Sequence, residues 1–565
     1  MNRTEGRVAG GVRTTDLLGP GSRFTRGLVE EYRRTGLWRD VNLAAYLTVD
    51  DETSGRPAAL SVDAGGTVTS SLTYEELNAM SRRVTAGLRR LGVGEGDTVA
   101  VMLPNCAEFS AVVFGILRAG AVYSGIPVTY GRREMGFMLA RAGARVLITA
   151  ERYGDRRLPD LVESVRSTLP GLTAVVVLAA TDPSSSDRIA FDELLDADPS
   201  VEDASVDPFS VAQLAFTSGT TDEPKAVMNL HVTLDAVIRN WVEHVGHETF
   251  GAPMVNLVMS PVGHSTGFFW GALMTAFLGG TAVYLERWQP ELGLRVLHEQ
   301  HVTTMIGSPT FLIDVLHLPE AVAAYVPDLR IVAVPGASIP RPLIPRAREQ
   351  LGCLVLPAWG MTEYGIGISG SPTLPRDRVE GTDGMPVNGC EVRVCDAEDA
   401  AVPNGVEGDL QIRGAGLFAG YYQRPDYTEA SFTSDGWFRT GDRADIDEDG
   451  FVSLRGRTKD IVIRGGENIP INEIETLLYA HPAVLSAAVV GIPDERLGER
   501  ACAVIELQPN AQEPNLAAIA EFLLAQGVSK RFLPERLLVV DQMPRTMSGK
   551  VRKVELRELA RKVAQ

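Results

Sequence analysis

Cysteine is scarce in this chain of 565 residues, and its pattern excludes two kinds of stabilisation. The cysteines number five, which is odd, and no CxxC pair occurs. A disulfide-stapled secreted domain or a zinc site needs paired or clustered cysteines, so neither is expected. This cysteine usage is typical of the reducing cytoplasm, which is the location we expect.

Positive charge is also in short supply. Lysine and arginine number 54 against 72 aspartates and glutamates, which gives a formal net charge of −18 and a pI of about 5.1. No long basic block offsets this field, so nucleic-acid binding is not expected.

Long uncharged apolar runs are almost absent. The first residues, MNRTEGRVAGGVRTTD, lack the apolar stretch that a signal peptide needs. One segment, Gly267 to Leu285, is long and uncharged enough to resemble a membrane span. Four glycines interrupt it, and Glu286 and Arg287 follow directly. We therefore expect a buried helix that runs into a buried strand, and no contact with a membrane.

Helical and extended patterns alternate up to about residue 370. An amphipathic helix is predicted from Thr73, which can form a capping box with Glu76. The runs TVAVMLP and ARVLITA indicate buried strands. This alternation predicts an α/β fold with parallel sheets. Short strands between Gly and Asp turns, at about 384–455, predict a β-rich subdomain.

The last part of the chain is expected to form a separate domain. GRTKD, at 456–460, lies between two compact regions, and enough residues follow it for an independent α/β domain. We expect a large N-terminal domain of stacked α/β sheets at 1–458 and a small, mobile α/β domain at 459–565. A small domain joined by one short segment can rotate as a unit.

The stretch FTSGTTDEPKAVM, from Phe216 to Met228, is typical of a loop that binds phosphate. Its small and hydroxyl-bearing residues let successive backbone N–H groups turn toward one anion, and Lys225 adds a positive charge. Asp222 places a carboxylate in the same loop, where it would repel a triphosphate.

Further motifs follow this loop in a recognisable order: PGASIP at 335–340, WGMTE at 359–363, DGWFRTGD at 435–442, IRGGEN at 463–468 and PRTMSGK at 544–550. On these motifs, the chain resembles the adenylate-forming superfamily from about residue 70 to residue 553. The superfamily comprises acyl-CoA synthetases, adenylation domains of peptide synthetases and firefly-type luciferases, and the acyl-CoA synthetases are the most similar. Its members make an acyl adenylate from a carboxylate and ATP, and then pass the acyl group to a thiol. Rotation of the small domain separates the two steps.

The resemblance implies a nucleotide site. Glu363 would hold Mg²⁺, because a metal must neutralise charge at the leaving pyrophosphate. Asp442 and Arg457 would bind the ribose from two sides, and Ala337 and Ser338 would lie beside the adenine. The remaining nucleotide-binding positions are Thr217, Ser218, Gly219, Thr220, Thr221, Lys225, Trp359, Gly360, Met361 and Thr362.

It also implies residues that act on the acyl group and on the thiol. Lys550 would bridge the carboxylate and the α-phosphate during adenylation. Lys459 would be the hinge, and His264 would be a gate beside the acyl pocket. Gly465 and Gly466 would let the pantetheine arm of CoA pass close to the backbone. The implied acyl pocket consists of Asn240, Trp241, Gly263, Ser308, Thr310, Gly336, Ile366 and Ile368. We expect a bulky, largely apolar acid, alicyclic or aromatic.

Two departures from the family's loop, Asp222 and Ala226 in place of glycine, bear on the two half-reactions. Glycine permits positive φ and close approach of phosphate, so we expect a side chain at either position to obstruct the loop. A carboxylate about 4 Å from a phosphate oxygen costs roughly 4 kcal/mol at an effective dielectric near 20, or about a thousandfold in rate. ATP would place its β- and γ-phosphates on this loop, whereas an acyl adenylate carries one phosphate, held elsewhere. Our main hypothesis is therefore an enzyme that makes acyl-CoA from preformed acyl-AMP, supplied by a separate adenylating enzyme.

The alternative is a complete ATP-dependent acyl-CoA ligase whose loop tolerates Asp222. Further alternatives are acyl transfer to a carrier protein, a luciferase-like oxygenase and a non-catalytic acyl-AMP-binding protein. The main hypothesis and the complete ligase share their ligands: the AMP moiety of an acyl adenylate (or ATP), CoA, Mg²⁺ and a carboxylic acid. The sequence leaves the acyl group and the oligomeric state open, and a homodimer agrees with the family.

Overall fold

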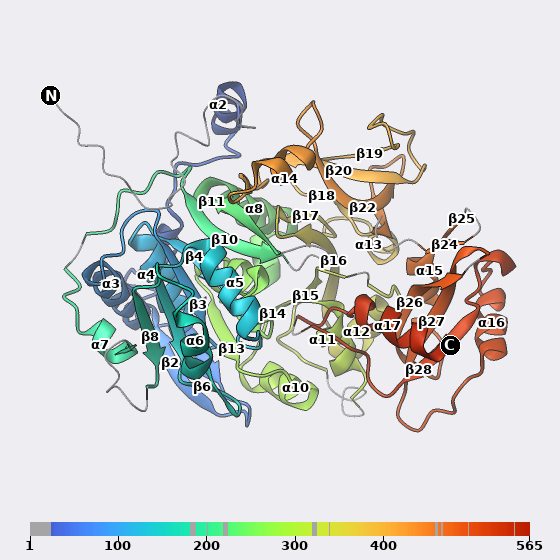
Figure 1. The fold of residues 1–565 in the computed structure, drawn as a ribbon, viewed down its shortest axis with the longest axis horizontal. Helices are drawn as coiled ribbons and strands as arrows, with labels where there is room; N and C mark the ends of the chain where they lie inside the picture. Colours follow the sequence, from blue (N-terminus) through green and yellow to red (C-terminus); the bar gives the residue numbers. More distant parts are fainter. Residues whose placement is uncertain are drawn as a thin grey trace.

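The computed structural model describes residues 24–564, apart from 181–187, 201, 218–223, 319–324, 338, 458–461, 465–466, 495 and 547. Within these ranges, a large N-terminal domain contains sheets of nine, eight and four strands, and a small C-terminal domain contains a sheet of five (Figure 1). A two-stranded ribbon, β6 (Arg152–Tyr153) and β7 (Arg156–Arg157), completes the strands.

The eight-stranded sheet has the order β21-β11-β10-β4-β3-β5-β8-β9. Neighbours from β10 to β9 run parallel, and every residue of β3, β4 and β5 is buried, as expected for strands covered on both faces. Its strands are β3 (Thr98–Met102), β4 (Val122–Gly125), β5 (Val146–Ala150), β8 (Ala174–Leu178), β9 (Arg188–Ala190), β10 (Val211–Thr217), β11 (Lys225–Leu230) and β21 (Gly420–Tyr421). The helices of this region are α3 (Tyr74–Arg90), α4 (Glu108–Arg118), α5 (Arg132–Ala142), α6 (Leu158–Arg166) and α7 (Phe191–Leu195).

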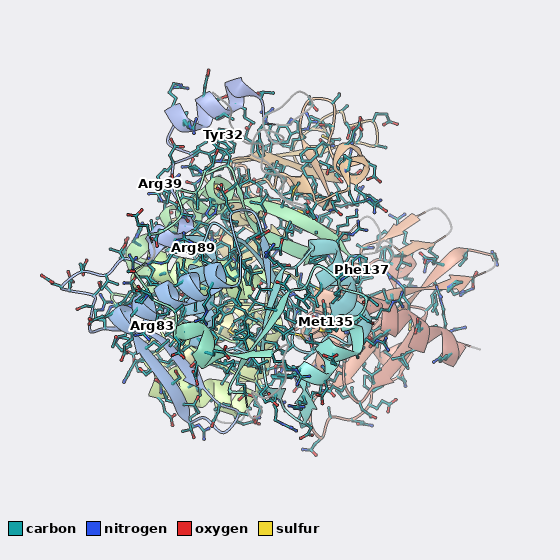
Figure 2. The ribbon with its side chains drawn as sticks, turned by 60° about the vertical axis from the view of Figure 1, so that its left-hand side comes forward. Tyr32, Arg39, Arg83, Arg89, Met135 and Phe137 are labelled. Carbon is teal, nitrogen blue, oxygen red and sulfur yellow. The ribbon has the colours of Figure 1, made fainter. Side chains whose placement is uncertain are left out.

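The helix predicted at Thr73 is α3, and its capping box is confirmed. The Glu76 amide donates to the Thr73 hydroxyl at 3.2 Å, and the Thr73 amide donates to a Glu76 carboxylate oxygen at 2.8 Å. The apolar stripe faces the core, whereas Figure 2 shows Arg83 and Arg89 on the outer side of the helix.

The nine-stranded sheet has the order β18-β17-β16-β15-β14-β12-β13-β1-β2, with antiparallel strands only toward its edges. Its strands are β1 (Pro57–Val62), β2 (Val68–Thr73), β12 (Val255–Val258), β13 (Thr281–Leu285), β14 (Thr304–Ile306), β15 (Ile331–Val334), β16 (Leu354–Met361), β17 (Gly365–Ser369) and β18 (Met385–Pro386). The helices around it are α8 (His231–Val245), α9 (Met274–Phe277), α10 (Pro290–Glu299), α11 (Pro309–Leu316), α12 (Leu343–Leu351) and α13 (Arg376–Gly381). Of these, α8 contacts β11 of the first sheet and β17 of the second, and is buried along most of its length.

The apolar segment from Gly267 to Leu285 is a buried helix followed by a buried strand, as predicted. A π-helical stretch, Gly267–Leu273, continues into α9, and β13 is buried throughout. None of the helices described is long and apolar enough to cross a membrane.

The region of short strands contains the four-stranded antiparallel sheet, in the order β19-β20-β22-β23. Its strands are β19 (Cys390–Cys395), β20 (Gly408–Gly414), β22 (Phe438–Ile446) and β23 (Val452–Arg457), and α14 (Pro425–Ala430) lies between β20 and β22 in the chain. The sheet lies beside the small domain in Figure 1.

The small domain has apolar clusters on both faces of its sheet. Ile474 of α15 and Leu523 of α16 pack on one face, whereas Leu556 of α17 packs on the other. Its elements are β24 (Val462–Arg464), β25 (Glu467–Ile469), α15 (Ile471–Tyr479), β26 (Val484–Asp494), β27 (Gly498–Leu507), α16 (Leu516–Ala525), β28 (Arg536–Val540) and α17 (Lys553–Ala564).

The N-terminal segment, which shows little pattern in the sequence, is packed into the large domain from residue 24 onward. After α2 (Arg26–Arg34), the Trp38 indole is buried and donates to the Ala415 carbonyl at 2.8 Å. Arg39, labelled in Figure 2, forms an ion pair with the fully buried Asp235, which also accepts a hydrogen bond from the Tyr46 hydroxyl at 2.7 Å. The segment therefore contributes to the fold through contacts that are distant in sequence.

Candidate active site

Lys550 lies in the loop that joins β28 to α17, and this loop reaches the large domain. The Thr310 hydroxyl, on α11, donates a hydrogen bond to the Gly549 carbonyl at 2.6 Å. A Cβ added to Gly336 would lie 3.5 Å from the Lys550 Nζ, which places the lysine beside the PGASIP loop. The lysine predicted to act in adenylation therefore lies at the junction of the two domains.

The charge on Lys550 depends on its surroundings. The residue remains accessible to solvent. Even so, partial desolvation by the protein and then the guanidinium of Arg457 lower the pKa of its amino group, against the attraction of Asp442 and Glu363. Three of the predicted nucleotide-site residues thus act on Lys550 electrostatically.

The predicted ribose site is a connected group. Asp442 on β22 is 6% exposed, and the Trp359 indole donates to one of its oxygens at 2.9 Å. The Arg457 Nε donates to the other oxygen at 3.1 Å, because β22 and β23 pair these two residues directly. Burial raises the pKa of Asp442, whereas Arg457 opposes that rise. The sequence motifs indicate each residue but not the bond from Trp359.

Glu363 forms another part of the candidate site, beside Tyr421 and near Lys225. The carboxylate is buried and accepts a hydrogen bond from the Tyr421 hydroxyl at 2.9 Å. Burial raises its pKa, and the charges of Arg457 and Lys225 act in the opposite direction. The Lys225 Nζ lies 5.0 Å from the Tyr421 ring centroid and 4.2 Å from that of Tyr427. Neither tyrosine is indicated by a motif, since each reaches the site only through folding.

The metal expected at Glu363 is compatible with this arrangement. The described residues contain no group of three or more His, Cys, Asp or Glu side chains that could hold a metal alone. Mg²⁺ is commonly bound by one or two protein carboxylates together with substrate phosphates and water. A single buried carboxylate, held in place by Tyr421 near Lys225, is consistent with that kind of binding.

The phosphate loop connects two antiparallel strands. Ser218, Gly219, Thr220, Thr221 and Asp222 lie outside the described residues, but Thr217 at the end of β10 pairs with Lys225 at the start of β11. Four other predicted site residues also lie outside the described residues: Ser338, Lys459, Gly465 and Gly466.

The expectation that Ala226 obstructs this loop is wrong. Ala226 pairs with Phe216 inside β11, and its carbonyl accepts from the Tyr422 amide at 2.8 Å. Its φ is not positive, and its side chain is buried in an apolar cluster that includes Leu214 and Val232. An extended strand tolerates any Cβ, so glycine is not required at this position.

His264 lies in the same region as Lys550. Burial and, second, the charge of Lys550 lower the pKa of His264 to about 4. The imidazole is therefore neutral near pH 7. Its ring centroid lies 6.5 Å from that of Tyr130 in an edge-to-face arrangement.

The residues predicted for the acyl pocket fall into two groups. Trp241, Ile366 and Ile368 are fully buried, as is Asn240, and the Trp241 indole donates to the Ser369 hydroxyl at 3.1 Å. Gly263 packs tightly, since a Cβ there would lie 2.6 Å from the backbone of Ile126.

The second group lies at the domain junction. Gly336 lies beside Lys550, while Ser308 and Thr310 face Gly549. The Thr310 hydroxyl is hydrogen-bonded to the Lys550 loop, a contact that the pocket assignment does not include, and its place in the acyl pocket stays a prediction.

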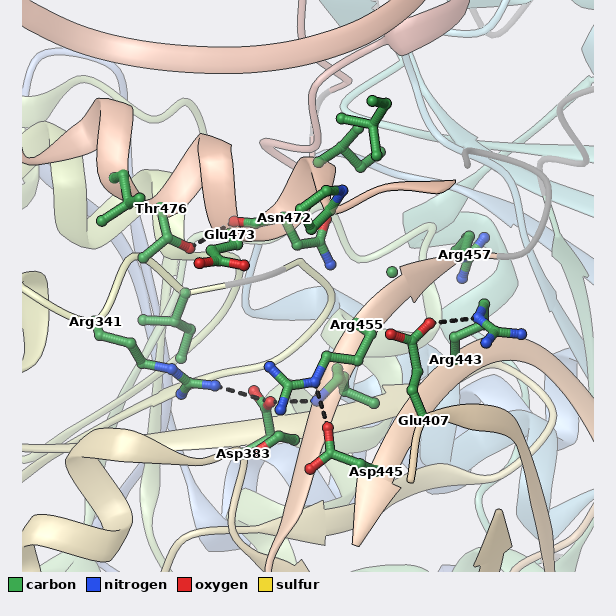
Figure 3. Close-up of a pocket in the computed structure, with 18 of the residues that line it drawn as sticks. Arg341, Asp383, Glu407, Arg443, Asp445, Arg455, Arg457, Asn472, Glu473 and Thr476 are labelled. Atoms are coloured by element: carbon green, nitrogen blue, oxygen red, sulfur yellow. Dashed lines mark hydrogen bonds and ion pairs between the residues drawn. The ribbon is translucent and has the colours of Figure 1, made fainter. Parts of the chain in front are cut away.

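A cavity of about 620 Å³ opens between the two domains beside Arg457 (Figure 3). Its large-domain wall carries ion pairs, among them Arg341–Asp383 at 2.8 Å and Arg443–Glu407 at 2.6 Å. The first turns of α15 form the opposite wall. Because Arg457 also contacts Asp442, the cavity adjoins the ribose end of the candidate site.

The family comparison matches both parts of the chain. Residues 49–422 match the AMP-binding enzyme family, and residues 473–550 match the AMP-binding enzyme C-terminal domain. The chain is 31% identical to the medium-chain fatty-acid–CoA ligase of Escherichia coli strain K12, over 93% of this chain and 92% of the relative. It is 33% identical to a salicylyl-CoA synthase / salicylate adenylyltransferase of a Streptomyces species, over 94% and 96%.

A solved structure agrees with these relatives. The anthranilate CoA ligase AuaEII, in complex with anthranoyl-AMP, superposes with a TM-score of 0.83 at 25% identity, covering 93% of this chain and 98% of that chain. The predicted α/β architecture, with a large N-terminal and a small C-terminal domain, is confirmed. The chain therefore belongs to the AMP-binding enzyme family, the adenylate-forming enzymes that its motifs resemble.

Proposed function

We propose that this protein is a complete ATP-dependent acid–thiol ligase, which joins a carboxylic acid to AMP and then transfers the acyl group to CoA. The observation that carries the proposal is the position of Lys550, whose loop is hydrogen-bonded to the large domain. A cation beside the Asp442–Arg457 pair is placed to stabilise the negative charge of a carboxylate and an α-phosphate.

The substrate class follows from the pocket and from the relatives. The relatives are named for a medium-chain fatty acid and salicylate, and the solved structure holds anthranoyl-AMP. Trp241, Ile366 and Ile368 are apolar or aromatic and buried. We infer a bulky, largely apolar carboxylic acid.

In the adenylation step, each described residue has a separate task. Asp442 and Arg457 hold the ribose, and the Lys550 ammonium stabilises charge that develops between the carboxylate and the α-phosphate. Glu363 and Lys225 face the pyrophosphate, where bound Mg²⁺ would supply further charge neutralisation. His264, which is neutral near pH 7, adds no charge beside the acyl group.

The thiol step requires the Lys550 loop to move away from the acyl adenylate. We infer that the small domain, at 459–565, rotates about Lys459 and brings Gly465 and Gly466 toward the acyl adenylate. The cavity beside Arg457 leaves space between the domains for such a rotation. This type of domain movement is established for enzymes that run two steps in one site.

A second function, transfer from preformed acyl-AMP alone, is favoured by one sequence feature, the Asp222 carboxylate. Two observations weigh more heavily for the complete ligase. The Lys550 loop contacts the large domain, and an enzyme that only transfers the acyl group from acyl-AMP would not need that contact. One relative is named for both adenylation and CoA-ester synthesis.

The deciding experiment compares two reactions of the purified protein. One contains a panel of bulky carboxylic acids with ATP, Mg²⁺ and CoA, and the other contains synthetic acyl-AMP and CoA. We expect acyl-CoA from both, with AMP and pyrophosphate released in the first. Acyl-CoA from the second reaction alone would contradict the complete ligase and support transfer from preformed acyl-AMP.

Glu363→Gln tests the pyrophosphate end of the site. The substitution keeps the shape but removes the negative charge, so we expect adenylation to fall by about 100-fold with a raised requirement for Mg²⁺. Acyl transfer from synthetic acyl-AMP should be unchanged. Acid-dependent pyrophosphate release, measured across a Mg²⁺ titration, checks this.

The matched control is Glu391→Gln. Glu391 pairs with Arg413 on the exposed β19–β20 surface, and its substitution should leave both steps unchanged. Equal losses in both half-reactions of the Glu363 variant would show that Glu363 supports the fold rather than the metal.

A further inference from the structure

Arg545 joins the small domain to the large domain at the base of the Lys550 loop. Its Nη2 donates to the Ser486 hydroxyl on β26 at 2.7 Å, a contact within the small domain. Its Nη1 donates to the Thr310 hydroxyl on α11 at 2.7 Å, a contact across the domain junction. The same nitrogen lies 3.2 Å from the Gly549 carbonyl oxygen. One guanidinium therefore connects both domains and the residue before Lys550.

The large-domain side of this contact fits the loop closely. Thr310 accepts from Arg545 and donates to the Gly549 carbonyl, so its hydroxyl is used in both directions. Gly549 has φ +80°, and a Cβ there would lie 2.3 Å from the Ser308 hydroxyl. Only glycine allows both that conformation and that approach.

Electrostatics favour the same arrangement. Asp314, one turn further along α11, is held by the Trp288 indole at 2.9 Å. Burial raises the pKa of Asp314, and the charge of Arg545 counteracts this rise. The large domain therefore attracts Arg545 through the charge of Asp314, in addition to accepting its hydrogen bond at the Thr310 hydroxyl.

We propose that Arg545, Thr310 and Gly549 form an interdomain clamp that holds Lys550 in the adenylating orientation, with Arg545 as a positioning residue. The proposal rests on the proposed function, in which Lys550 serves adenylation and must leave before the thiol step. Contacts made in only one of two domain orientations stabilise that orientation, and so favour the half-reaction that uses it.

The first test measures the two half-reactions separately in Arg545→Ala. We expect acid-dependent pyrophosphate release to fall by about tenfold or more, the factor expected for losing a charge-assisted hydrogen bond. Transfer from synthetic acyl-AMP to CoA should not fall. Arg545→Lys should restore adenylation in part, because lysine keeps the charge but lacks the planar fork that reaches Thr310 and Ser486 together.

Thr310→Val separates the clamp from the acyl pocket. It removes the hydroxyl and keeps the shape, so adenylation should fall through kcat while the KM for the acid is unchanged. Arg536→Ala is the control, since Arg536 lies exposed on β28 of the same domain and its described hydrogen bond goes to the neighbouring Glu535 carbonyl. It should change neither step.

A second measurement follows the domain orientation without any turnover. The cysteines described are all buried, so spin labels would attach selectively to Val406→Cys and Leu524→Cys, which replace residues that are 46% and 37% exposed on the large and small domains. The doubly labelled protein that keeps Arg545 gives the reference distance between the labels. In the same protein with Arg545→Ala, we expect a fraction of the molecules to show a different distance.

The outcomes separate the clamp from the proposed function. If the unsubstituted protein adenylates, an unchanged adenylation rate in Arg545→Ala, or equal losses in both half-reactions, overturns the clamp. If the unsubstituted protein does not adenylate, the proposed function fails. The label-to-label distances with and without Arg545→Ala then decide whether the clamp exists. An unchanged distance distribution then overturns the clamp, and a shifted one supports it.

Discussion

Replacing Lys550 by alanine should lower the rate of acyl-adenylate formation by about 100- to 1,000-fold, the range seen when one preorganised electrostatic contact to a transition state is removed. Acyl transfer from synthetic acyl-AMP to CoA should be unchanged, because the acyl–phosphate bond already exists. Acid-dependent pyrophosphate release measures the first step, and acyl-CoA formation measures the second. A large defect in transfer would contradict the role assigned to Lys550.

The pH profile gives an independent check on the same residue. Partial desolvation and the charge of Arg457 lower the pKa of Lys550, and adenylation needs the charged ammonium. The rate of adenylation should therefore decline as the pH rises through that lowered pKa, while transfer shows no such decline. In Lys550→Arg the guanidinium stays charged, so the remaining adenylation should lose its alkaline decline. An unchanged profile in this variant would assign the decline to another group.

Replacing Asp222 by glycine should raise the rate of adenylation, and it is the second change with a large expected effect. If the carboxylate lies about 4 Å from a phosphate oxygen, removing it gains up to roughly 4 kcal/mol, or about a thousandfold. Transfer from acyl-AMP should be unaffected, since that ligand has no β- or γ-phosphate. Steady-state kinetics with varied ATP, alongside the transfer assay, measures both.

Two further variants separate charge from backbone freedom. Asp222→Asn removes the charge and keeps the size, so it should give most of the gain if repulsion is the cause. Ala226→Gly should give no gain in adenylation, and should destabilise the fold by about 0.5–1 kcal/mol because it places glycine inside a strand. An increase with Ala226→Gly, or none with Asp222→Gly, would show that the loop does not limit adenylation through Asp222.

Much of the fold is predictable because its signals are local. The capping box at Thr73, the buried strands and the segment from Gly267 to Leu285 all form as expected, since each depends on the spacing of residues close in sequence. The N-terminal segment is the exception. Trp38 bonds to Ala415 and Arg39 to Asp235, and no local pattern predicts contacts between residues so far apart in sequence.

The sequence predicts those residues of the candidate site that belong to recognisable motifs. The motifs place Asp442, Arg457, Glu363 and Lys550, and folding brings their charges together. What they miss are supporting residues such as Tyr421, which approach through tertiary structure.

The error at Ala226 and the incomplete description of Thr310 have a related origin. Glycine was expected at Ala226 from a loop pattern, although the position lies in a strand. Thr310 was assigned to the acyl pocket, and no pattern indicates that its hydroxyl also binds a loop from the other domain. In both cases the sequence pattern does not specify the structural surroundings that determine what the residue does.

The packing of the N-terminal segment also bears on how the chain folds during synthesis. Trp38 is translated 377 residues before its hydrogen-bond partner Ala415. Asp235, fully buried in the finished protein, meets Arg39 across 196 residues. Contacts with such long separations form slowly and late. This segment is therefore translated long before it can reach its place, and until then the nascent large domain carries an exposed tryptophan and lacks the Arg39 and Tyr46 partners of Asp235, which keeps Arg239 of its own helix at 3.8 Å.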